Sequence, residues 1–142
     1  MRATNIPVLS ACLLLLGICA ASANADIAIV VHPSFQGTSL SKSDFASLYL
    51  GRSSTFPSGN QATPIDQPSG PVRDQMLSQL LDKTDAQMAH IWSRLVFSGN
   101  AKSLPKVADD KAMLERVAKD PSAIGYVDAS SVNSSVKVLA IK

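Results

Sequence analysis

Apolar residues along this chain follow patterns that predict strands and helices in alternation. The continuous apolar run at residues 27–31, IAIVV, is typical of a strand covered on both faces, as in a parallel sheet with helices on either side. Residues 123–127 and 136–141 predict two strands near the end of the chain. Residues 62–66 predict a short, weak strand, and Pro64 within it favours either the edge of a sheet or the end of a strand.

Helical spacing of apolar residues occurs between these strands, and each helix has a suitable first residue. The helices are expected to begin after Ser41, at Pro71, after Thr84 and near Asp109 or Asp110. The third has the strongest pattern, with apolar side chains three and four residues apart: Met88, Ile91, Trp92, Leu95 and Val96. The sequence therefore predicts one α/β domain over residues 26–142, with a mixed sheet flanked by helices and no internal repeat.

Residues 1–25 have the pattern of a secretory signal peptide. Arg2 charges the start, residues 8–21 form an apolar core, and Ala-Asn-Ala ends at Ala25, where we expect cleavage. The apolar run is shorter than the roughly 20 residues that span a bilayer, which argues against a membrane anchor. A lipid-attachment box, LSAC, precedes the apolar run instead of following it. We therefore expect a mature protein in a bacterial periplasm.

Charge, cysteine content and missing motifs narrow the classes of function. The net charge is only +2, and acidic and basic residues are interspersed, which argues against nucleic acid as a partner. Both cysteines, Cys12 and Cys19, lie in the predicted signal peptide, and the two histidines, His32 and His90, form no metal-binding motif. The chain has no P-loop and no Gly-x-Ser-x-Gly motif. We expect a binding protein, not an enzyme, with no metal and no cofactor.

One segment, Ser69 to Arg73, combines several groups that bind anions. A helix that begins at Pro71 offers free amide donors, Ser69 adds a hydroxyl, Gly70 permits close approach, and Arg73 adds a guanidinium. The alternative is that Ser69 or Gly70 only caps the helix while Arg73 pairs with an acid such as Asp66 or Asp128.

Tight anion binding would need a second wall opposite this segment. The hydroxyl-rich loop at residues 34–39, which includes Ser39, follows the first strand. Ligands in open α/β sheets lie at the carboxyl ends of strands, so we expect both loops at the carboxyl ends of their strands, on the same side of the sheet.

Taken in order along the chain, these segments resemble the type 2 periplasmic substrate-binding proteins, in particular short chains related to the phosphate-binding proteins of ABC importers. The segments that carry the resemblance are IAIVVHPS (27–34), SLSKSDFASLYLGRSSTFPSGNQATPID (39–66), SGPVRDQM (69–76), IWSRLVFSGN (91–100) and DPSAIGYV (120–127). The resemblance implies one lobe of that fold, binding without chemistry, and an oxyanion such as phosphate as ligand. It also implies that Ser69, Gly70 and Arg73 lie in the anion-binding segment and Ser39 in a hydroxyl-bearing loop.

Three positions depart from the family's pattern. Gln67 stands where phosphate binders commonly have arginine, Pro71 lacks a backbone donor, and Met76 replaces an aromatic residue. The chain is also about half the length of a two-lobed binding protein. Two functions follow: a periplasmic solute-binding domain that delivers an oxyanion to a membrane importer, or a ligand-free interaction or sensor module of the same fold with an envelope signalling partner. The sequence does not indicate an oligomeric state.

Overall fold

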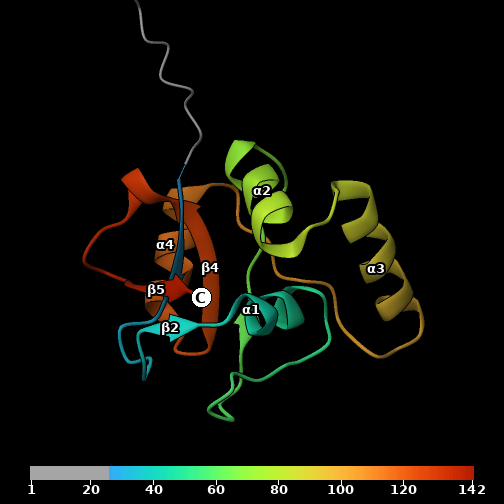
Figure 1. Cartoon of the computed structure of the whole chain (residues 1–142), viewed down its shortest axis with the longest axis horizontal. Helices are drawn as coiled ribbons and strands as arrows, with labels where there is room; N and C mark the ends of the chain where they lie inside the picture. The colour runs from blue at the N-terminus through green and yellow to red at the C-terminus, as the bar shows by residue number, and fades with distance from the viewer. Residues whose placement is uncertain (1–25) are drawn as a thin grey trace, which may run out of the picture.

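The computed structural model describes residues 26–142 of the chain, so the predicted signal peptide, its cleavage site and both cysteines lie outside the described residues. The predicted strands and helices follow one another in the expected order (Figure 1), and one further short strand, at residues 39–40, was not predicted. The elements are β1 (Ile27–Val31), β2 (Ser39–Leu40), α1 (Lys42–Tyr49), β3 (Thr63–Pro64), α2 (Pro71–Met76), the π-helical turn η1 (Leu77–Leu81), α3 (Asp85–Phe97), α4 (Asp110–Lys119), β4 (Ala123–Asp128), the 3-10 turn η2 (Ala129–Ser131) and β5 (Lys137–Ile141).

The strands form one mixed sheet, as predicted, in the order β2-β5-β1-β4-β3. The central strand β1 pairs antiparallel with both β4 and β5, whereas β2 is parallel to β5 and β3 is parallel to β4. The expectation that β1 lies among parallel strands is therefore wrong. Its unbroken apolar run reflects burial on both faces, which does not depend on the direction of neighbouring strands. The predicted edge position of Pro64 is confirmed.

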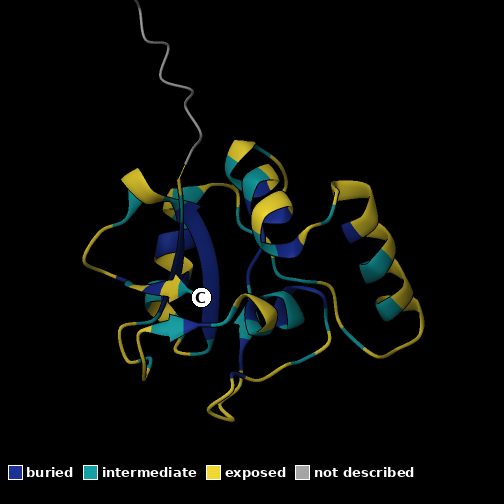
Figure 2. Cartoon of the chain, in the orientation of Figure 1, coloured by how far each residue is buried: buried dark blue, intermediate teal, exposed yellow. Residues whose placement is uncertain are grey.

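Helices cover both faces of the sheet, which gives two apolar cores. Ile29 and Val31 point into the core beneath α1 and α2, and Ala28 and Val30 point into the core beneath α4. Figure 2 shows β4 buried along most of its length between these layers. Gly125 allows close packing here, because a Cβ at this position would lie 2.4 Å from the Met113 sulfur.

Side-chain caps fix the starts of three helices. The Ser41 side chain accepts from the Asp44 amide, Thr84 forms a capping box with Gln87, and the Asp109 side chain accepts from the Ala112 amide. α2 begins at Pro71 as predicted, but no side chain caps it. α2 continues directly into η1. Met76 of α2 and both Leu77 and Leu81 of η1 are buried.

α3 is the helix with the least complete cover. Figure 1 shows it at the side of the molecule, away from the sheet. Of its apolar stripe only Met88 is buried, while Val96 is 41% and Phe97 92% exposed. The helix is held to α1 by the indole Nε1 of Trp92, which donates to the Tyr49 carbonyl at 2.9 Å. Across residues 26–142, no helix combines the length and the apolar character needed to cross a membrane.

Candidate functional site

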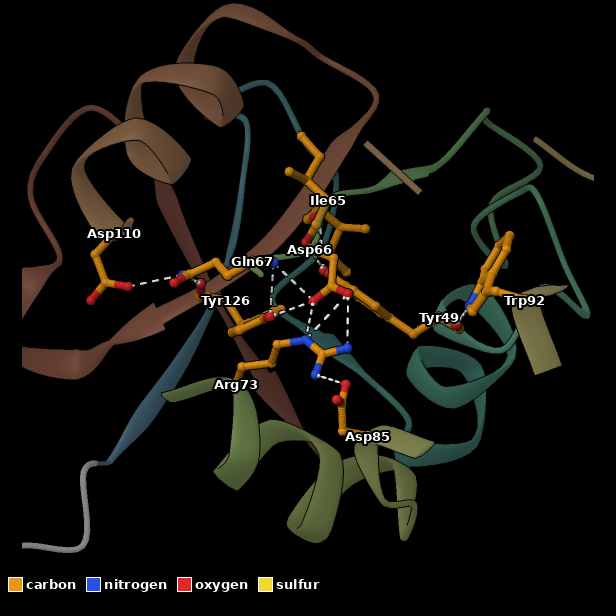
Figure 3. Close-up of polar contacts among 10 residues, drawn as sticks. Tyr49, Ile65, Asp66, Gln67, Arg73, Asp85, Trp92, Asp110 and Tyr126 are labelled. Carbon is orange, nitrogen blue, oxygen red and sulfur yellow. Dashed lines mark hydrogen bonds and ion pairs between the residues drawn. The ribbon is translucent and has the colours of Figure 1, made fainter. Parts of the chain in front are cut away.

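Three buried polar residues lie just after β3 and in the first turn of α2. Asp66 is 2%, Gln67 5% and Arg73 5% exposed, and they are the only buried polar or charged residues between positions 26 and 142. The chain stays beside β4 after β3 ends, because the Ile65 amide donates to the Ile124 carbonyl at 2.9 Å. This pairing directs Asp66 toward the first turn of α2, from which Arg73 projects (Figure 3).

The Arg73 guanidinium is held by two carboxylates. Its Nε donates to Asp66 Oδ1 at 3.2 Å, its Nη2 donates to Asp66 Oδ2 at 3.3 Å, and its Nη1 contacts Asp85 at the start of α3. Asp66 also accepts hydrogen bonds from the Tyr126 hydroxyl and from the backbone amide of Gln67. The Asp66 partner is buried, but the Asp85 side chain is 74% exposed.

Gln67 connects this ion pair to the opposite face of the sheet. Its Nε2 donates to Asp110 Oδ1 at 2.9 Å and to the Tyr126 carbonyl at 3.2 Å. Asp110 is the first residue of α4, so the side-chain amide of Gln67 links the segment after β3 to the helix on the other face of the sheet. The hydrogen bonds of the Gln67 side-chain amide are thus made within the protein.

The surroundings keep the arginine charged and the tyrosines neutral. Burial lowers the pKa of Arg73, but the hydrogen bonds and charge interactions with Asp66 and Asp85 together raise it more, so the pKa lies above the ordinary value. Burial raises the pKa of Tyr126, and the charge of Asp66 raises it further. Burial likewise raises the pKa of Tyr49, whose hydroxyl donates to the Ile65 and Ile124 carbonyls.

A cavity of about 330 Å³ opens beside the ion pair. Asp66, Asp85 and Arg73 line one part of it, while Trp92 and Phe97 supply apolar wall. An anion entering near the guanidinium would meet two carboxylates that already share its positive charge. Within residues 26–142, no group of three or more His, Cys, Asp or Glu side chains is arranged to hold a metal ion.

The predicted anion-binding residues lie at different depths. Ser69 is exposed, and Gly70 is half-buried with a φ of +124° and open space where a Cβ would be. Arg73 is buried, and its predicted alternative pairing with Asp66 is confirmed. The other suggested acid, Asp128, instead accepts hydrogen bonds from Ser130.

Ser39 is far from this segment in the sheet. It lies on β2, and three strands separate β2 from β3. β1 is antiparallel to β4, and β3 is parallel to β4. The carboxyl end of β1 therefore lies beside the amino end of β4, whereas the carboxyl end of β3 points toward the carboxyl end of β4. The expectation that the loop at residues 34–39 faces Ser69 to Arg73 is therefore wrong, because it assumed that β1 and β3 run in the same direction.

Two partners in the network, Asp85 and Tyr126, were not predicted. Asp85 follows the Thr84 cap, where an acid is explained by the helix dipole alone. Tyr126 is an inward-facing residue of an apolar strand, so its hydroxyl attracts no notice in the sequence. Alternation along β4 places Tyr126 on the same face as Ile124, toward α1 and α2, which is the signal that could have placed its hydroxyl near Asp66.

Comparison with solved structures identifies the class of fold. An ABC-type phosphate transport receptor from Vibrio cholerae aligns with a TM-score of 0.62 and 19% identity over 81% of this chain and 45% of its own. PstS from Borrelia burgdorferi aligns with a TM-score of 0.62 and 13% identity over 82% of this chain and 47% of its own. A protein from Clostridium perfringens solved with bound phosphate gives a TM-score of 0.62 and 16% identity, over 81% of this chain and 44% of its own.

The predicted fold, one lobe of a phosphate-receptor-type periplasmic binding protein, is confirmed by these alignments. The chain spans less than half the length of each of these structures. No protein-family model matches the sequence, and no curated protein matches it.

Proposed function

We propose that this chain is a periplasmic solute-binding domain that receives phosphate or a similar oxyanion for an ABC-type importer, without chemistry of its own. The observation that carries the proposal is the fold, which aligns over about four fifths of the chain with an ABC-type phosphate transport receptor and with a putative phosphate ABC transporter substrate-binding protein. The phosphate in their names is transferred to this chain as a hypothesis, and the proposed periplasmic location rests on the predicted signal peptide.

The start of α2 is the place we propose for the oxyanion. The helix has no side-chain cap, so the amides of its first turn keep free donors, although Pro71 supplies none. Ser69 is exposed beside this turn, and the space above Gly70 is open. We propose that Arg73, held from below by Asp66 and Asp85, positions α2 and leaves the direct contacts to Ser69 and the backbone.

A specific observation favours a second candidate, a ligand-free interaction module of the same fold. The Arg73 guanidinium is shared by two carboxylates, which reduces the positive charge available to an anion. Two of the neighbours described above are named as transport proteins, and they give no support for a signalling partner in the envelope.

Thermal unfolding in the presence of inorganic phosphate separates the two candidates. Phosphate at 100 times its dissociation constant should stabilise a binder by about 2.7 kcal/mol. Ser69→Ala should reduce this gain, whereas Ser58→Ala, an exposed serine in the turn after Phe56, should keep it. Sodium chloride at the same ionic strength controls for a general salt effect. If phosphate at about 10 mM leaves the midpoint unchanged, the interaction module is the better description.

A further inference from the structure

A second cleft lies between the end of α1, β3 and α3. Its volume is about 580 Å³, which is within the roughly 300–1,000 Å³ of sites for small organic ligands. Trp92 and Leu104 contribute apolar surface, Arg52 and Lys102 contribute positive charge, and Ser54 and Ser103 contribute hydroxyls. We call these six residues the basic cleft. It contains none of Ser69, Gly70 and Arg73, so it is separate from the start of α2.

The charges in the basic cleft are not neutralised by the protein. No aspartate or glutamate lines it. The ion pairs within residues 26–142 are those of Arg73 with Asp66 and with Asp85, so Arg52 and Lys102 have no such partner there. The cleft therefore presents two unpaired cations next to apolar surface, an arrangement that favours an anionic group attached to an apolar body.

The charge of the basic cleft differs from that of the cavity beside the ion pair. Asp66 and Asp85 line only the cavity beside the ion pair, although both cavities share the wall formed by Trp92, Ser103 and Leu104. In the cavity beside the ion pair, the two carboxylates balance the charges of Arg73 and Lys106, whereas the charged residues of the basic cleft are all positive. Attraction of an anion to α3 is therefore expected on the side of the basic cleft.

The wall formed by Trp92 is fixed by the backbone of α1. The indole Nε1 donates to the Tyr49 carbonyl at 2.9 Å, which holds the ring in one orientation. Gly51, at a φ of +71°, allows α3 to approach, because a Cβ there would lie 2.4 Å from Leu95 Cδ1 and 3.4 Å from Trp92. An anchored aromatic ring is a preorganised surface, which lowers the entropic cost of ligand binding.

We propose that the basic cleft binds a small organic anion, with its charged head group at Arg52 and Lys102 and a body about the size of one ring against Trp92 and Leu104. Neither residue of the head-group site is needed for the oxyanion contacts proposed at α2. The two proposals can therefore fail independently.

Intrinsic fluorescence tests this proposal, because Trp92 is the only tryptophan in the chain. Phenyl phosphate combines an anionic head with one ring, inorganic phosphate is the head alone, and benzyl alcohol is the ring alone. With excitation selective for tryptophan, phenyl phosphate should give a saturable change at about millimolar concentration, as expected for a ligand of this size. Each half alone should bind about tenfold more weakly or not at all.

Matched charge variants locate the binding. Arg52→Gln combined with Lys102→Gln should weaken phenyl phosphate by about tenfold or more, since both charge-assisted contacts are lost. Lys111→Gln combined with Arg116→Gln removes the same charge from exposed positions on α4 and should leave the affinity within about twofold. Ser103→Glu, which adds a negative charge to the cleft, should also weaken binding. Circular dichroism checks that each variant is folded.

The proposal is overturned if no saturable change occurs up to about 10 mM phenyl phosphate. It is also overturned if the two charge variants lose affinity equally, or if inorganic phosphate reproduces the whole response. Loss of phosphate stabilisation in Ser69→Ala would not bear on it.

Discussion

Substitution of Asp66 by asparagine should destabilise the fold strongly, because it removes a buried charge that four donors share. The carboxylate is 2% exposed and accepts from Arg73 Nε, Arg73 Nη2, the Tyr126 hydroxyl and the Gln67 amide. Removal of one member of a buried ion pair costs about 3–5 kcal/mol, since the other charge is left uncompensated. Asp85 still contacts Nη1 but is 74% exposed, and such a pair contributes only about 0–1 kcal/mol. We expect a loss of about 3 kcal/mol for Asp66→Asn.

Urea unfolding monitored by far-UV circular dichroism measures this loss, with the free energy of unfolding extrapolated to water. Asp85→Asn is the matched control, because it removes the same charge from the exposed partner and should cost about 1 kcal/mol or less. In a double-mutant cycle, Asp66→Asn with Arg73→Met should cost at least about 2 kcal/mol less than the sum of the single changes.

Two results would refute this reasoning. One is a cost for Asp66→Asn no larger than that for Asp85→Asn, which would mean that water solvates the Asp66 carboxylate. The other is simple additivity in the cycle, which would mean that Arg73 does not depend on Asp66 and that its guanidinium is available to a ligand.

Two further predictions follow from the cores. Gly51→Ala should reduce the free energy of unfolding by about 1–3 kcal/mol, because φ is +71° and the new Cβ would lie 2.4 Å from Leu95 Cδ1. Gly59→Ala, at a φ of +90° with nothing within 4 Å of the new Cβ, controls for backbone strain in the same urea assay. An equal cost for both substitutions would show that the contact with Leu95 adds nothing. Burial raises the pKa of Tyr49 and of Tyr126, so both phenols stay protonated in the fold above pH 10 while the unfolded chain ionises near about 10. Stability should therefore be fully present below about pH 10 and fall as the pH rises further, with tyrosinate absorbance appearing together with the loss of circular dichroism; a tyrosinate step in the folded protein would contradict this.

Local patterns in the sequence predicted most of the helices and strands. The Thr84 capping box, Pro71 at the first helical position and the apolar run of β1 each act within a few residues, so spacing alone reveals them. The π-helical turn after Met76 was not predicted, because α-helical and π-helical turns show similar apolar spacing over five residues.

Long-range relations were harder to predict. The direction of β1 relative to its neighbours decides whether the loop at residues 34–39 can face Ser69, and no local signal encodes that direction. Likewise, the contact of Asp85 with Arg73 depends on the turn after η1, where Asp82 has a left-handed backbone conformation with a φ of +53°. The candidate residues and the pairing of Arg73 with Asp66 could be named from the sequence, but the contacts with Asp85 and Tyr126 could not.

The two outer strands also bear on behaviour at high concentration. β2 and β3 have two residues each, and one residue of β3 is Pro64, which has no amide hydrogen to donate. A strand from another molecule would find almost no continuous row of backbone donors and acceptors on either side of the sheet. We therefore expect the folded domain to resist aggregation through strand addition, even though much of its interior is built from β-rich apolar sequence.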